Sequence, residues 1–117
     1  MPWRGGSMGD EALVFKIKAD FLKALGHPVR LAVIERLKMR EASVGQLVSA
    51  LGVEQSSISK HLAILRLAGI LTARQVGVTV FYSVKDRGIY KVLRPISEIL
   101  RKKLTESRDI LSRLGKV

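Results

Sequence analysis

The sequence contains no cysteine. Disulfide bonds, thiolate metal ligands, cysteine nucleophiles and thiol redox sensors are therefore all excluded. Acidic residues are few: 10 Asp and Glu stand against 21 Lys and Arg, which leaves a formal net charge of +11. This excess of positive charge favours a polyanionic partner, either nucleic acid or an anionic membrane surface, over a protein that is merely basic.

Long hydrophobic runs are also missing, because no segment reaches the roughly 18 apolar residues that a membrane helix needs. The glycine-rich residues 1–9 lack the hydrophobic segment of a signal peptide, and two acidic residues follow directly. We therefore expect a cytoplasmic protein with no membrane partner and a disordered leader at residues 1–9. Hydrophobic residues make up 47% of the chain, which is enough for the core of one domain at residues 10–117.

Apolar residues in the first half of the chain recur at helical spacing. They predict helices at residues 10–25, 28–39 and 55–68, and a short one from the Ser43 cap to Leu51. Ser43 and Gln46 have the spacing of a capping box. The first helix is apolar on two sides, which is typical of a helix packed between layers. The side chains expected to face inward from the second and fourth helices are Val33, Ile34, Leu37, Ile58, Leu62 and Leu65.

The second half begins with alternating residues and ends in a helical pattern. Strands are expected at Leu71–Arg74 and Val78–Val84, around a turn at residues 75–77. Asp86 then opens a helical stretch that Pro95 interrupts or restarts. An apolar stripe follows, formed by Ile96, Ile99, Leu100, Leu104, Ile110, Leu111 and Leu114. The fold is therefore expected to be mainly α, a winged helix-turn-helix of five to six helices with a two-stranded antiparallel wing.

The candidate binding residues lie on the outward face of the fourth helix. Its expected outward residues are Gln55, Ser56, Ser59, Lys60, Ala63 and Arg66, none of them acidic. Such a face suits the major groove of DNA, because amides and hydroxyls can bond to base edges while cations neutralise phosphates. The alternative is a solvated helix face that touches nothing.

Two runs of residues resemble the ArsR/SmtB family of winged-helix repressors. Residues 21–31 read FLKALGHPVRL, similar to the family's L-x-H-P-x-R run, and residues 55–65 read QSSISKHLAIL, similar to its recognition helix. Arg74, Gly77 and Tyr82 match the family's wing, so the resemblance covers about residues 10–84. It implies a homodimer that pairs through its first and last helices and reads an inverted repeat in double-stranded DNA. It also implies that Arg74 meets phosphate or the minor groove.

The chain departs from the family pattern where many members sense metals. Ser43 and Gly45 stand where cysteines bind metal, and no histidine follows His61 to serve a zinc or nickel site on the last helix. Val78 follows Gly77 where a basic residue is usual at the wing tip. The resemblance therefore implies a member without metal, cofactor or thiol sensing, and it leaves the effector unknown.

Other functions remain as alternatives to DNA binding. A winged-helix module that binds a protein or RNA is the main one, and it should expose aromatic or large apolar anchors. An enzyme is not expected, because the serines near His61 lack an acid or a nucleophile-elbow context. His27 is expected to cap or pack, and His61 to be structural or to contact phosphate. The basic residues at 101–103 and 108 either line a dimer helix or form an extra anion surface.

Overall fold

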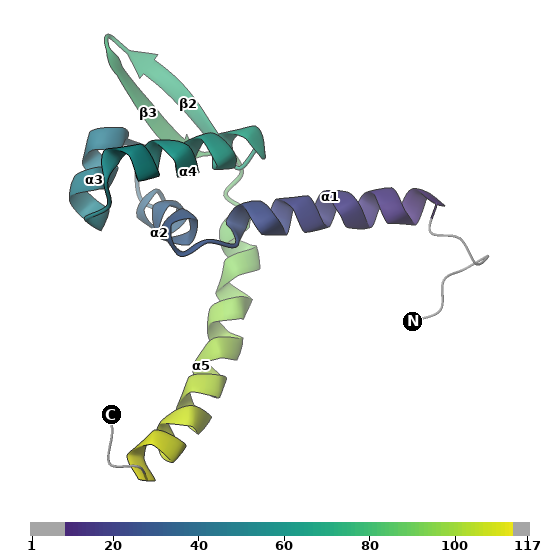
Figure 1. Ribbon diagram of the computed structural model, residues 1–117. Coiled ribbons are helices and arrows are strands. Elements are labelled where there is room, and N and C mark those ends of the chain that lie inside the picture. The colour runs from purple at the N-terminus through teal and green to yellow at the C-terminus, as the bar shows by residue number, and fades with distance from the viewer. Residues whose placement is uncertain (1–8, 114–117) are drawn as a thin grey trace. The chain divides into compact units, whose positions relative to one another are not determined.

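The computed structural model describes residues 9–113, with side chains as far as residue 108. The elements are α1 (Gly9–Leu25), α2 (Pro28–Arg36), β1 (Ala42–Ser43), α3 (Val44–Leu51), α4 (Gln55–Leu67), β2 (Leu71–Val76), β3 (Thr79–Val84) and α5 (Ile89–Arg113) (Figure 1). The chain divides after Lys85 into two units, so α5 is described by itself. Most of the expected leader and the last residue of the expected apolar stripe lie outside the described residues.

The core of the first unit lies where α2, α3 and α4 pack together. Its largest fully buried side chains are Ile34, Leu47, Ile58, Leu62, Leu65 and Val33. All six side chains expected to face inward from the second and fourth helices are buried, which confirms the helical pattern in that part of the sequence. Removal of this apolar surface from water is the main force that holds the three helices together.

A tight turn joins α3 to α4. Gly52 ends α3 in the left-handed conformation at φ 65°, and its N–H donates to the carbonyl of Val48 at 2.9 Å. A side chain at this backbone angle would be strained, so glycine suits the position. The turn sets α4 across the preceding helices as the second helix of a helix-turn-helix (Figure 1).

The sheet has three strands rather than the expected two, in the order β1-β3-β2. β1 pairs antiparallel with β3, with Ala42 opposite Tyr82. The sequence does not reveal β1 because two residues are too few to show alternation. The hairpin ladder also extends to Val76 opposite Thr79, so the turn is shorter than expected and contains only Gly77 and Val78.

Several helix boundaries differ from the sequence prediction. α2 ends at Arg36 rather than near Met39, because Leu37 is already its buried C-cap. α5 begins at Ile89 rather than Asp86, and it runs through Pro95 without a break. Asp86 still precedes the helix as a turn residue, since its Oδ1 accepts from the N–H of Gly88 at 2.8 Å. None of the helices within residues 9–113 is long and apolar enough to cross a membrane.

Candidate nucleic-acid interface

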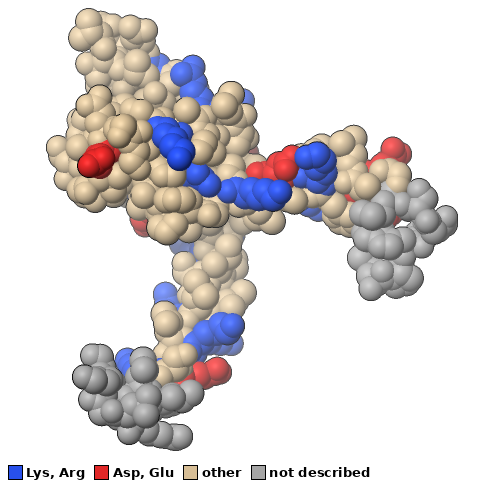
Figure 2. Space-filling view, in the orientation of Figure 1, with Lys and Arg blue, Asp and Glu red and all other residues tan. Residues whose placement is uncertain are grey.

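One face of α4 gathers most of the residues that the sequence singled out. The exposed positions include Gln55, Ser56, Ser59, Lys60, Ala63 and Arg66, as the helical spacing predicted. The opposite face is buried through Ile58, Leu62 and Leu65. Figure 2 shows Lys and Arg side chains over α4, with few acidic atoms on the same face. The first unit therefore presents a polar, cationic helix surface.

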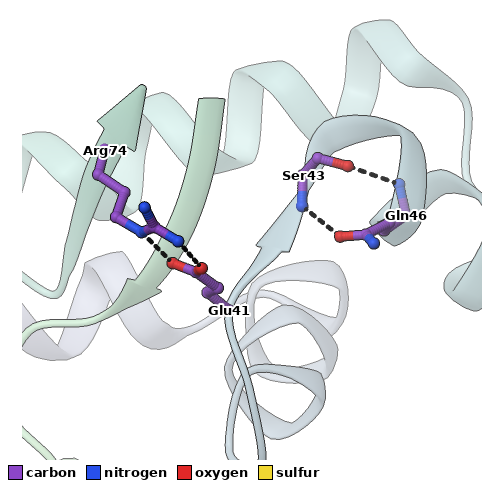
Figure 3. Close-up of polar contacts among 4 residues, drawn as sticks. All are labelled: Glu41, Ser43, Gln46 and Arg74. Carbon is purple, nitrogen blue, oxygen red and sulfur yellow. Dashed lines mark hydrogen bonds and ion pairs between the residues drawn. The ribbon is translucent and has the colours of Figure 1, made fainter. Parts of the chain in front are cut away.

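The two helices of the helix-turn-helix begin differently. At the start of α3, the hydroxyl of Ser43 accepts from the N–H of Gln46 at 3.2 Å, and the Gln46 side chain accepts from the N–H of Ser43 at 2.9 Å (Figure 3). This confirms the capping box. At the start of α4, Glu54 is the N-cap and its side chain makes no capping bond. Within the part of the chain that the structure describes, no side chain caps the first-turn amides of α4, which suits an approaching phosphate oxygen.

Arg74, the candidate on the wing, is held by an acidic residue that precedes β1. Its Nε donates to Oε2 of Glu41 at 2.8 Å, and its Nη2 donates to Oε1 of the same carboxylate (Figure 3). The hydrogen bond from Arg74 lowers the pKa of the Glu41 carboxyl, and the same bond raises the pKa of Arg74. Sequence reasoning missed Glu41, because the partners are 33 positions apart and neither lies in a pattern that pairs them.

Two histidines lie on the buried side of α4: His61 belongs to the helix itself, and His27 is the N-cap of α2. The Nδ1 of His27 accepts from the N–H of Val29 at 3.0 Å, which confirms its expected role at the start of α2. His61 is 5% exposed, and its ring centroid lies 4.1 Å from that of His27. The structural reading of His61 therefore holds, and the ring is buried on the side of α4 away from the candidate face.

Arg30 contacts His61 on the same side of α4. Its Nη1 lies 3.1 Å from Nδ1 of His61, and its Nη2 donates to the carbonyl of Lys23 at 3.2 Å. One side chain of α2 thereby ties the last turn of α1 to the buried side of α4. Burial lowers the pKa of His61, and the positive charges of His27, Arg30 and Lys60 lower it further.

Comparison with known proteins identifies the family. The sequence model described as "Bacterial regulatory protein, arsR family" matches residues 27–73. The uncharacterized HTH-type transcriptional regulator Rv0081 of Mycobacterium tuberculosis is 36% identical over 102 residues, which cover 86% of this chain and 90% of that protein. This chain belongs to the ArsR family of transcriptional regulators.

Solved structures and a curated repressor agree with this assignment. The crystal structure of Rv0081 superposes with a TM-score of 0.72 at 37% identity, covering 80% of this chain and 95% of that one. The transcriptional repressor PagR of Bacillus anthracis is 35% identical and covers 67% of this chain and 82% of its own length. A homodimeric winged helix-turn-helix DNA-binding domain, Mb0332 of Mycobacterium bovis, shares the fold with a TM-score of 0.74 at 22% identity, over 87% of this chain and 94% of that one.

In this ArsR-family chain, the positions where the family resemblance places metal ligands lie at the start of α3 and have a structural role there. Ser43 is the N-cap of α3, and Gly45 is exposed. Across the described part of the chain, no three His, Asp or Glu side chains lie close enough together to hold a metal ion. The wing tip also departs from the family pattern, because Val78 is 98% exposed and presents an apolar side chain.

Proposed function

We propose that this chain is a homodimeric repressor that binds an inverted-repeat operator in double-stranded DNA with α4 in the major groove. The outward face of α4 carries the proposal: all six of its predicted residues are exposed, and none is acidic. In this arrangement Gln55 bonds to an adenine edge, while Ser56 and Ser59 bond to bases or phosphates.

Charge supports the same placement of α4. Lys60 and Arg66 are exposed on this helix and would neutralise phosphates on either side of the groove. The chain as a whole carries a formal net charge of +11, which favours association with a polyanion. Arg74 would add a phosphate contact from the wing, and the first-turn amides of α4 would supply another contact with the DNA backbone.

Unburied apolar side chains support the homodimer. On α1, Leu13 and Ile17 are each 60% exposed and Leu22 is 55% exposed; on α5, Ile99 is 60% and Leu104 is 68% exposed. Large apolar side chains left exposed along a helix in this way favour a protein–protein interface. We propose that a second copy covers these faces, with α1 and α5 of each subunit at the interface. Mb0332, which shares the fold, is itself a homodimeric domain.

The interaction-module alternative fits the α4 surface less well. A protein-binding face is usually centred on aromatic or large apolar anchors. On α4 the only strongly exposed large apolar side chain among the described residues is Leu67, in the last turn. The centre of the face is occupied by Ser59, Lys60 and Ala63, which offer hydrogen bonds and charge but no apolar anchor.

Selection from random duplex DNA tests the proposal. The purified protein is incubated with the library at about 150 mM salt, where non-specific binding is suppressed, and the retained DNA is sequenced. We expect an inverted repeat whose half-sites are separated by about one helical turn or a multiple of it. Lys60→Glu, which reverses the charge at the centre of the α4 face, should abolish the enrichment. A folded dimer that enriches no sequence would contradict the proposal.

A further inference from the structure

We propose that Glu41 is a positioning residue for DNA binding, which holds the guanidinium of Arg74 so that its remaining N–H edge is presented to a phosphate. This inference rests on the proposed function, because it concerns how the wing meets the DNA backbone. Glu41 precedes β1, lies outside the helix-turn-helix and would itself touch no DNA.

The Arg74 side chain reaches across the sheet to Glu41. Arg74 lies on β2 opposite Phe81 of the central strand β3, and Phe81 in turn lies opposite Ser43 of β1. The guanidinium carbon lies 5.6 Å from the centre of the Phe81 ring, a favourable position for a cation over an aromatic face. The carboxylate of Glu41 then binds two nitrogens of the guanidinium. Phe81, against the face of the guanidinium, and Glu41, at its edge, therefore define its orientation.

The contact with Glu41 leaves part of the guanidinium unused. Arginine has five N–H donors in a planar fork, and the described bonds from Arg74 use Nε and Nη2 only. The Arg74 side chain is 62% exposed, whereas that of Glu41 is 31% exposed. The Arg74 side chain is thus more accessible than that of the residue that holds it. A planar fork fixed on one edge is well suited to bond a phosphate oxygen with the other.

A simple charge argument predicts the opposite effect. The negative charge of Glu41 repels DNA and offsets the charge of Arg74, so its removal should tighten binding. If Glu41 instead orients Arg74, its removal should weaken binding, because a free arginine must give up rotamer freedom when it meets the phosphate. The two effects differ in sign, so measured affinities can separate them.

A double-mutant cycle measures the positioning effect directly. Affinity for the selected operator is compared for the full-length protein, Glu41→Gln, Arg74→Ala and the double variant over a range of salt concentrations. We expect Glu41→Gln to weaken binding about threefold to tenfold while Arg74 is present, and not to weaken it in the Arg74→Ala background. Arg74→Ala should lower the salt slope by about one unit per subunit, whereas Glu41→Gln should leave the slope unchanged.

Two further variants complete the experiment. Glu35→Gln removes the same charge from an exposed residue of α2 with no described ion pair, and it should leave binding unchanged or slightly tighter. Glu41→Asp keeps the charge but shortens the side chain, so it should also weaken binding. Melting temperatures of all variants should stay close together, because an exposed ion pair contributes little to stability.

Three results would overturn the inference. Tighter binding by Glu41→Gln, as for Glu35→Gln, would mean that Glu41 only masks charge. Equal weakening with and without Arg74 would mean a general structural role. Normal binding by Glu41→Asp would show that the length of the side chain, and with it the two-bond contact to Arg74, is not required. A wild-type protein that binds no duplex DNA would instead contradict the proposed function, before the cycle is measured.

Discussion

At the scale of single residues, His61 couples the stability of α4 to pH. Its ring is buried next to His27 and Arg30, and burial together with these positive neighbours lowers its pKa. The unfolded chain should therefore take up a proton first, near the ordinary histidine value of about 6.5. The stability that the neutral His61 contributes is fully present above that value. It is lost as the pH falls from there towards the pKa of His61 in the folded protein.

Urea unfolding at a series of pH values checks this expectation. The free energy of unfolding should fall as the pH is lowered from about 7.5 to 5.5, because protonation places a further charge beside Arg30. His61→Gln should have a shallower pH profile over the same interval, even though its absolute stability is lower. Parallel profiles for the two proteins would assign the pH dependence to other groups.

Gln55 is expected to determine sequence preference rather than overall affinity. Gln55→Ala removes the amide that can bond to an adenine edge, so the preference at one position of each half-site should fall by about 1–3 kcal/mol. The measurement is competition binding between the selected operator and single-base variants. Ser49→Ala, at an exposed position of α3, is the control and should leave the preference intact. Unchanged discrimination by Gln55→Ala would remove this residue from the base contacts.

The α4 face could be predicted from the sequence, whereas the Glu41–Arg74 contact could not. Helical geometry relates the outward residues of α4 to the buried Ile58, Leu62 and Leu65 within a few positions, so the apolar spacing alone determines the exposed face. The partner of Arg74 depends on which strands lie side by side. That information comes from the three-stranded sheet, and its strand β1 carries no periodic signal.

At the scale of elements, the start of α3 depends on one reciprocal pair of hydrogen bonds. Ser43→Ala removes the hydroxyl that caps the N–H of Gln46, and loss of such a cap typically costs about 1 kcal/mol. We expect that decrease in the free energy of unfolding, measured with urea. Ser49→Ala, within the same helix, should be neutral or slightly stabilising, because alanine favours helix more than serine. Equal effects of the two variants would argue against a role for the cap.

The sequence predicts the elements that have a repeating pattern, but it does not predict where they end. The existence of α1 to α5 and the hairpin follows from spacing and end signals. The end of α2 was misplaced because the apolar pattern includes Leu37, which is a buried C-cap outside the helix. α5 runs through Pro95, although proline has no N–H to donate to the carbonyl of the fourth residue before it. Local rules therefore predict a break at Pro95, and the helix does not show one.

At the scale of the whole molecule, the proposed dimer depends on the exposed apolar side chains of α1. Ile17→Glu places a charge where Ile17 is now 60% exposed, and a charge there is costly if the partner covers it. We expect the variant to sediment as a monomer, or at least to dissociate at higher concentrations than the wild-type protein. Its affinity for the complete inverted repeat should fall accordingly, since only one half-site is then bound at a time.

A matched variant on the same helix controls for charge and folding. Lys23→Glu changes an exposed residue of α1 that lies six positions from Ile17, well away from it around the helix. This variant should remain dimeric, and both variants should keep the far-ultraviolet circular dichroism of the wild type. A dimeric Ile17→Glu protein would exclude this part of α1 from the interface.

The apolar surface of α1 also has a consequence for how long a newly made chain survives in the cell. In the proposed dimer, the exposed side chains of Leu13 and Ile17 would stay in contact with water until the second copy binds, and a lone chain would gain none of the stability that association adds. Chaperones and proteases act on such species continuously. Turnover should therefore be fastest when copies are few and should slow once synthesis raises their number, so the abundance of this regulator would rise more steeply than its rate of production.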